Sequence, residues 1–554
     1  MMKLKYILYL FFSGITLSCF SQNNTISWQR TIGGSNTDKL TGMVQTSDGG
    51  MVLCGYSNSN ISGDKTQNSI NDSYDFWIVK IGKTGLTQWA KTYGGSDRDL
   101  NPTIIQTQDS GFLVAGSSIS PASGIKTEDA INESFDYWAL KLDKLGNKIW
   151  DNTVGGIQFE KLVTVLESSS GYFLCGSSNS TLGNDKSLPN EGSSLWPDYW
   201  IVKLNKKSGV VIYDSTYGSK NRDALATAKI TKDGGIILGG TSYSPKYGHK
   251  SEDFFGNGDY WVVKLDSLGR EQWDKTIGGS LSDYLTSIDL VGNVGYVLGG
   301  YSNSPASFNK SKNCKGITDY WIVKIDNTGN VLWDKTYGGV GADYVTSIKY
   351  TKGNYLVGGY SNSNISGDKT SDSKGGYDFW NLTLDKSGKL LDQSDWGGSA
   401  DDLLVDYEAS GKTEYLLGGS SYSPKSGDKA VNTIGNTGNS DYWVFKVSPA
   451  GPIAQVQTSE PVIADAKTQN FKTQVSFDVS PNPVKDVLHI KYNAPVTQNI
   501  SISVYTNSGK MISQQILTQP NGNVDLDLSA QLSGIYYAVL QSGSSSFTKK
   551  FVKN

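Results

Sequence analysis

The chain of 554 residues is too long for one ordinary domain. Its 63 glycines, 11% aromatic residues and only 19% charged residues favour many short strands joined by tight turns, and they disfavour a helical bundle. A net charge of -3 without any basic run argues against nucleic-acid binding. The two histidines, His249 and His489, are too few and too far apart in sequence to favour a His-based catalytic or zinc site, so no catalytic residue is assigned.

Residues 1–21 have the features of a signal peptide. Lys3 and Lys5 form the charged start, residues 6–17 are mostly apolar, and Ser21 offers a small residue for cleavage. This apolar stretch is short for a bilayer, and no later stretch approaches ~18 apolar residues. We therefore expect export and no transmembrane segment.

A repeated Asp-aromatic-Trp triplet dominates the middle of the chain. Each triplet opens an alternating run, as in Trp77, Val79 and Ile81, which is typical of a strand. Three more short strands follow in each unit of about 60 residues, and four strands per repeat are typical of a propeller blade. The sequence thus predicts an all-β chain with a seven-bladed β-propeller over residues 25–448. The tryptophans are Trp77, Trp138, Trp200, Trp261, Trp321, Trp380 and Trp443.

The order of the strands predicts how the ring closes. A strand ending in a Gly-Gly pair first occurs at residues 26–33, before any other element, whereas the last triplet strand at 441–447 has no such strand after it. We expect the N-terminal strand to be outermost in the last blade, because closure of this kind removes open sheet edges.

Three polar positions recur in every repeat, and strand direction places all of them on the face that carries the long loops. The acidic set is Asp38, Asp99, Glu160, Asp223, Asp283, Asp343 and Asp402. The lysines are Lys65, Lys126, Lys186, Lys250, Lys310, Lys369 and Lys429. The triplet aspartates are Asp75, Asp136, Asp198, Asp259, Asp319, Asp378 and Asp441. The acidic set could form a ring for a cation such as calcium. Alternatively, lysines pair with aspartates while carboxylates cap strand-end amides, which presence in every blade favours.

Residues that break the repeat are the better candidates for ligand binding, since a single ligand breaks the symmetry. Aromatic rings among Asn, Asp and Ser could stack on a sugar and hydrogen-bond it, although anchoring of the loops to neighbouring blades is the alternative. The candidates are Arg98, Trp196, Arg222, Tyr247, His249, Phe254 and Phe308.

After a Pro-containing linker at residues 449–476, short alternating strands resume over 477–554. Motifs in this region resemble the type A sorting domain of type IX secretion cargo: Pro481, Asn482, Pro483, Gly534, Tyr536, Lys549 and Lys550. The resemblance implies handling by the type IX secretion machinery, passage through the outer membrane and removal of this domain, with the product released or attached to surface lipopolysaccharide. The strand pattern favours a small immunoglobulin-like β-sandwich.

These observations predict a secreted or cell-surface, noncatalytic propeller that binds a glycan or a protein through its long-loop face. No cofactor is implied apart from the calcium that the acidic ring could hold. Two alternatives stay open, since propellers host many unrelated functions. One is an extracellular polysaccharide-degrading enzyme that uses carboxylates near the channel mouth, and the other is a structural adhesion or matrix component.

Overall fold

The computed structural model describes residues 24–193, 195–411, 413–436, 438–449, 476–493, 500–506, 511–517, 521–542 and 545–554. The chain divides into two compact units, with the boundary between Ile453 and Ala454. The predicted signal peptide and the interior of the predicted linker lie outside the described residues.

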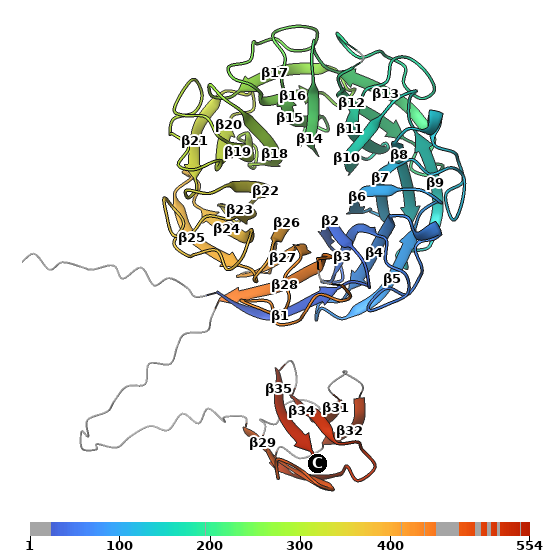
Figure 1. Cartoon of the computed structure of the whole chain (residues 1–554), viewed down its shortest axis with the longest axis vertical. Coiled ribbons are helices and arrows are strands. Elements are labelled where there is room, and N and C mark those ends of the chain that lie inside the picture. The colour runs from blue at the N-terminus through green and yellow to red at the C-terminus, as the bar shows by residue number, and fades with distance from the viewer. Residues whose placement is uncertain are drawn as a thin grey trace, which may run out of the picture. The chain divides into compact units, whose positions relative to one another are not determined.

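The described part of the first unit forms seven four-stranded antiparallel sheets arranged in a ring (Figure 1). We number them 1 to 7 in chain order. The innermost strands are β2 (Asp38–Gln45), β6 (Asp99–Gln106), β10 (Glu160–Glu167), β14 (Asp223–Ile230), β18 (Asp283–Leu290), β22 (Asp343–Thr351) and β26 (Asp402–Ser410). The second strands are β3 (Met51–Ser57), β7 (Phe112–Ser118), β11 (Tyr172–Ser178), β15 (Ile236–Ser242), β19 (Tyr296–Ser302), β23 (Asn354–Ser361) and β27 (Glu414–Ser421).

The third strands carry the triplets: β4 (Asp75–Ile81), β8 (Asp136–Leu142), β12 (Asp198–Leu204), β16 (Asp259–Leu265), β20 (Asp319–Ile325), β24 (Asp378–Leu384) and β28 (Asp441–Pro449). The outermost strands are β5 (Thr87–Tyr93), β9 (Lys148–Val154), β13 (Val211–Tyr217), β17 (Glu271–Ile277), β21 (Val331–Tyr337), β25 (Leu390–Trp396) and β1 (Asn24–Ile32). Two short 3-10 helices, η1 (Ile70–Asp72) and η2 (Ile131–Glu133), lie in long loops. These elements confirm an all-β fold of repeated, propeller-like sheets.

The triplet explains how neighbouring sheets pack. Its tryptophan is fully buried, and the aromatic residue of the preceding sheet packs on it, as in Tyr260 and Trp321 with ring centroids 4.8 Å apart. The Tyr260 hydroxyl also donates to the Trp321 carbonyl at 3.0 Å. A buried aromatic pair of this kind contributes about 0.5–1.5 kcal/mol beyond its buried area. The repeated triplet therefore joins each sheet to the next.

The N-terminal strand closes the ring, as the order of the motifs predicts. β1 pairs antiparallel with β28 and completes the sheet of β26, β27 and β28. The packing between sheets continues across this junction, because the Tyr442 hydroxyl donates to the Trp77 carbonyl at 3.0 Å.

The second unit contains two antiparallel sheets among its described residues. One has β29 (Ser476–Ser480), β30 (Val487–Asn493) and β33 (Asn521–Asp527); the other has β31 (Ile500–Thr506), β32 (Met511–Leu517), β34 (Gly534–Ser542) and β35 (Ser545–Lys553). Buried residues from both sheets, including Ile490, Val504 and Phe551, form one apolar core. No helix in the described part of the chain is long and apolar enough to cross a membrane.

Candidate functional site

The acidic set is buried at the long-loop end of the innermost strands, and each of its seven members is fully inaccessible to solvent. Asp343 shows the usual arrangement: its Oδ2 accepts from the Gly339 N–H at 2.9 Å and from the Ser363 hydroxyl at 3.2 Å. Before sheet 4 a serine replaces the second glycine of the pair, and both the Ser219 N–H and its hydroxyl donate to Asp223, the hydroxyl at 2.5 Å. These carboxylates therefore cap backbone amides, as the structural alternative predicts.

The triplet aspartates meet the acidic set of the next sheet. The side chains of Asp136 and Glu160 hydrogen-bond to each other. Burial, reinforced by the neighbouring acid, raises the pKa of Asp75 and Asp198 to about 8 and that of Asp136 to about 9. These aspartates therefore hold a proton at neutral pH. The carboxyl pairs are Asp75 and Asp99, Asp136 and Glu160, Asp198 and Asp223, Asp259 and Asp283, Asp319 and Asp343, Asp378 and Asp402, and Asp441 and Asp38.

The glycine pairs leave room for this network. A Cβ on Gly397 would lie 1.8 Å from Asp378 Oδ1, and a Cβ on Gly398 would lie 2.6 Å from the Cβ of Ser423. Neither position tolerates a side chain without displacement of its neighbour. Carboxyl packing thus explains the first glycine of the pair, and the serine that bonds to the acidic residue explains the second.

The geometry gives no support to a calcium ring. In the part of the chain that the structure describes, no three His, Cys, Asp or Glu side chains form a group that could hold a metal ion. The carboxyl groups meet in pairs, whereas calcium takes about six to eight oxygen ligands.

The repeated lysines have other partners than expected. Lys65 Nζ donates to the Thr92 hydroxyl at 2.6 Å and lies 5.6 Å from the ring centroid of Trp77. Lys186 has the same arrangement with Thr216 and Trp200. Of the predicted lysine–aspartate pairs, the described residues show one, between Lys369 and Asp395 of the outermost strand. Lys65 and Lys186 instead pass over the buried tryptophan and donate to a threonine of that strand, so for them the prediction of an ion pair is wrong.

The predicted ligand-binding residues lie in the long loops and in the links before the innermost strands, and Phe254 directly precedes Phe255, on which Phe308 stacks. Trp196, Tyr247 and Phe254 are exposed, at 46%, 49% and 42%. His249 Nδ1 lies 2.9 Å from Glu271 Oε2, and this hydrogen bond raises the pKa of His249. Arg98 lies over the Phe135 ring and Arg222 over the Tyr243 ring, with distances of 5.3 and 5.5 Å to the ring centroids.

Phe308 is the unusual member of this set. Its backbone has φ of 48°, in the left-handed region, and its side chain is 67% exposed. Bulky residues rarely adopt this conformation, which costs about 1–3 kcal/mol and is often found at functional sites. The ring stacks on Phe255 of sheet 4 at a centroid distance of 4.8 Å.

Six tyrosines that no sequence pattern singled out form a belt at the long-loop end of sheets 4 to 6. We call it the tyrosine belt: Tyr243, Tyr284, Tyr301, Tyr344, Tyr360 and Tyr377, all partly exposed. Rings contact each other along the belt, at 5.0 Å for Tyr284 and Tyr301, 4.8 Å for Tyr301 and Tyr344, and 5.4 Å for Tyr344 and Tyr360. The position of Tyr301 and Tyr360 holds Ser117, Ser177 and Ser420 in three other sheets, Thr241 in sheet 4 and Tyr56 in sheet 1. Tyrosine at this position in the two neighbouring sheets 5 and 6 is the signal that could have revealed the belt.

The innermost strands surround a channel of about 320 Å³, lined by threonine and serine hydroxyls and by small or aliphatic side chains. One charged group breaks its symmetry. Lys349 Nζ lies 3.1 Å from Asp406 and 2.6 Å from Glu408. Burial and the neighbouring Asp406 raise the pKa of Glu408, whereas Lys349 and the Ser347 hydroxyl lower that of Asp406.

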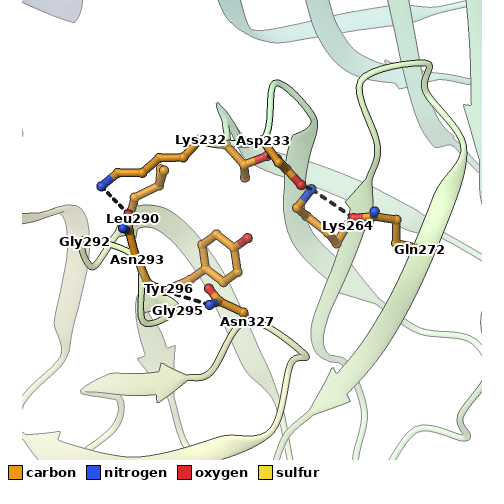
Figure 2. A pocket seen from close by; sticks show the side chains of 11 residues that line it. Lys232, Asp233, Lys264, Gln272, Leu290, Gly292, Asn293, Gly295, Tyr296 and Asn327 are labelled. Atoms are coloured by element: carbon orange, nitrogen blue, oxygen red, sulfur yellow. Dashed lines mark hydrogen bonds and ion pairs between the residues drawn. The ribbon is translucent and has the colours of Figure 1, made fainter.

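A pocket of about 320 Å³ lies on the opposite face, among the turns of sheets 4 and 5 (Figure 2). Its charged side chains are paired with each other or with amides: Lys264 donates to Asp233 at 2.8 Å and Lys232 to Asn293 at 2.6 Å. The Lys264 pair recurs in sheet 1 as Lys80 and Asp48, 2.9 Å apart. A pocket built from a repeated pair is better explained as part of the scaffold.

In the second unit, the predicted sorting residues Pro481, Asn482 and Pro483 lie beside the last strand. Asn482 Oδ1 accepts from the Val552 N–H at 2.9 Å. Gly534 begins β34, and the Tyr536 ring stacks on Phe551. The two basic residues of the motif, Lys549 and Lys550, are exposed.

Residues 478–554 match the family model described as "Secretion system C-terminal sorting domain". The match agrees with the motifs in Pro481–Pro483 and Gly534–Tyr536. The chain is therefore cargo of type IX secretion, exported to the cell surface or the extracellular space.

Similarity over the ring is more distant. The chain is 22% identical over 364 residues to the regulatory protein FlaEY of Caulobacter vibrioides, and the match covers 60% of this chain and 38% of that protein. This chain thus matches well under half the length of that relative. Among solved structures, a quinohemoprotein alcohol dehydrogenase of Pseudomonas putida has 9% identity, a TM-score of 0.35 and coverage of 83% of this chain and 80% of that one. An acylaminoacyl peptidase of Pyrococcus horikoshii has 8% identity, a TM-score of 0.36 and coverage of 83% and 58%.

Proposed function

We propose that the exported protein is a seven-bladed β-propeller that binds an extracellular glycan through its long-loop face. The tyrosine belt carries this proposal. Contiguous, partly exposed aromatic rings give stacking surface, and their hydroxyl groups can hydrogen-bond sugar hydroxyls, a combination typical of ligand sites.

The remaining parts of the chain have roles in delivery. Residues 1–21 direct the first export step as a signal peptide, residues 449–476 link the two units, and residues 477–554, an immunoglobulin-like sandwich, are recognised by the type IX machinery. The propeller over residues 25–448 is the part that acts outside the cell. The match of the C-terminal residues to the sorting family supports this division.

The test is binding of the purified exported protein to a broad glycan array, in calcium and in chelator. Tyr301→Ser and Tyr360→Ser introduce the residue that other sheets carry, so they should fold while weakening binding at least tenfold, or about 1.4 kcal/mol. Tyr415→Ile, at the other end of the second strand, is the matched control because Ile236 holds that position in sheet 4. Unchanged binding by both serine variants would remove the belt from the proposal. Loss of glycan binding in chelator would instead support a calcium ion held by the acidic set.

The enzyme alternative is supported by the channel carboxylates. Opposite pKa shifts on Asp406 and Glu408 are the pattern by which carboxyl groups divide acid and base roles. Turnover of a polysaccharide that Glu408→Gln abolishes, with binding intact, would favour this function over simple binding.

A further inference from the structure

One repeated backbone position holds a glycine in five sheets and an aromatic residue in sheet 5. It lies two residues before the repeated lysine, where φ is positive in every sheet. The other occupants are Gly63, Gly124, Asn184, Gly248, Gly367 and Gly427, with φ between 53° and 58°. Phe308 has φ of 48° at this position. Glycine adopts this conformation without strain, whereas a phenylalanine must be held in it.

Packing between the sheets does not require the ring. At other boundaries a side chain from the preceding sheet contacts the glycine: a Cβ on Gly124 would lie 2.5 Å from Ile70 Cδ1, and one on Gly367 would lie 2.9 Å from Lys315 Cδ. Phe255 occupies the position of Ile70 and Lys315. In sheet 5, Phe308 therefore adds a second ring that stays 67% exposed.

A pocket of about 520 Å³ lies beside this aromatic pair. Phe255 and Asn309 line it together with Glu252, Lys275 and Asn330. Glu252 is held by two contacts, since its Oε1 lies 2.8 Å from Lys275 Nζ and its Oε2 accepts from the Thr276 N–H at 2.9 Å. The pocket wall thus combines an aromatic ring, amides and a charge pair that is already neutralised.

We propose that Phe308 and Phe255 form a stacking platform for a neutral polysaccharide of gluco configuration, a proposal that rests on the glycan-binding function above. A gluco pyranose ring has equatorial hydroxyls, so its flat faces present C–H groups that suit the negative face of an aromatic ring. Its edge hydroxyls both donate and accept, which matches the amides and the carboxylate of the pocket wall. The internal pairing of Glu252 with Lys275 leaves no unbalanced cation for a phosphate or a uronate, and this favours a neutral sugar.

The test uses the purified exported protein and cellohexaose as the probe, with calorimetric binding and thermal unfolding measured for each variant. Phe308→Gly restores the residue of the other sheets. We expect it to weaken cellohexaose binding at least tenfold and to melt no lower than the parent protein, because backbone strain is relieved. Ile365→Ala, an exposed apolar residue in the equivalent loop of sheet 6, should change neither quantity.

Three results would overturn the proposal: no binding of cellohexaose by the parent protein, undiminished binding by Phe308→Gly, or a clearly lower melting temperature of that variant, which would make Phe308 a packing residue. Failure of this site is distinguishable from failure of the proposed function. If the glycan array binds both the parent protein and Phe308→Gly but does not bind Tyr301→Ser, the proposed function holds and only the Phe308 site fails.

Discussion

The long loops at residues 303–318 and 362–377 follow the second strands of sheets 5 and 6, and both bond in the same way to the link that precedes the innermost strand. Asn303 and Asn362 each accept from the backbone N–H that precedes an acidic residue, at 2.9 and 2.7 Å. Ser307 and Ser366 each accept from the residue after a Gly-Gly pair, at 2.9 and 3.0 Å. We call these repeated hydrogen bonds the loop frame. The frame is the same in both loops, yet the first loop has Phe308 where the second has Gly367.

The difference shows where this architecture tolerates change. Side chains that bond inward are repeated because each satisfies a buried amide or hydroxyl, and an unsatisfied group costs about 1–3 kcal/mol. Side chains that point outward vary from sheet to sheet. Recognition can therefore be placed on one loop without altering the ring.

Substitution of the buried acidic residues beside the loop frame should have the largest effect on stability. Asp343→Ala and Asp283→Ala each remove the acceptor for a buried glycine N–H and a serine hydroxyl. We expect each to lower the free energy of unfolding by about 2–4 kcal/mol, measured by urea unfolding. The two costs should agree within about 1 kcal/mol; a much larger difference would show that the loop frames are not equivalent.

Transferring the aromatic residue to sheet 6 should cost less. Gly367→Phe places a bulky side chain at φ of 56°, where a Cβ would lie 2.2 Å from the Gly338 carbonyl oxygen. A loss of about 1–3 kcal/mol in the free energy of unfolding is expected from backbone strain. Gly353→Ala, with open space around its Cβ, separates conformational strain from collision. If Gly367→Phe left the free energy of unfolding unchanged, the loop would accept aromatic residues without strain.

The carboxyl pairs predict a pH dependence that the loops share. Burial, with smaller contributions from Asp395 and Asp402, raises the pKa of Asp378 to about 7. The folded state then binds the proton that the unfolded state releases near pH 4, so the free energy of unfolding falls as pH rises from about 4 to 7. Thermal unfolding across this pH range should show the decrease, and Asp378→Asn should reduce it by the contribution of one group, of order 1 kcal/mol, while the other carboxyl pairs keep theirs.

Asp385→Asn is the control for this pH series. Hydrogen bonds from Ser387 and Lys389 lower the pKa of the exposed Asp385, so its contribution has the opposite sign and is lost as pH falls. If the free energy of unfolding of the parent protein rose steadily from pH 4 to 7, the carboxyl pairs would not hold a proton in the folded state.

The smallest effect is expected at Cys314, which stands where the loop of sheet 6 has Ser373. Its Sγ contacts the Gly316 carbonyl oxygen at 3.3 Å, and burial raises its pKa to about 11. Cys314→Ser should change the free energy of unfolding by less than about 0.5 kcal/mol. In the native protein a maleimide should label Cys314 slowly and should leave the buried Cys54 and Cys175 unmodified. Rapid labelling of either buried thiol would indicate opening of the sheets.

The strands and the closing of the ring were predictable because their signals are local. Period-2 alternation after each triplet and the order of the motifs indicated where β1 pairs. The tyrosine belt was not visible in this way, because Tyr301 lies on β19, Tyr344 on β22 and Tyr377 in the loop before β24. Only the register of the strands and the packing of sheet on sheet bring their rings together.

The partners of repeated charges were also beyond the sequence. Lys65 and Asp75 are close enough along the chain to suggest an ion pair, yet the Lys65 ammonium reaches Thr92 on the outermost strand. Which groups meet inside a sheet boundary depends on side-chain direction, and sequence spacing does not fix that direction.

The sequence by itself determined the all-β repeat, the pairing of the first and last strands and the export route, since alternation, motif order and the sorting motifs are written in neighbouring residues. The tertiary structure alone decided that the acidic residues pair across sheet boundaries, that tyrosines of three sheets form one belt, and that Phe308 stands in a strained conformation beside a pocket. These depend on distances between residues remote in sequence, which packing of the sheets sets.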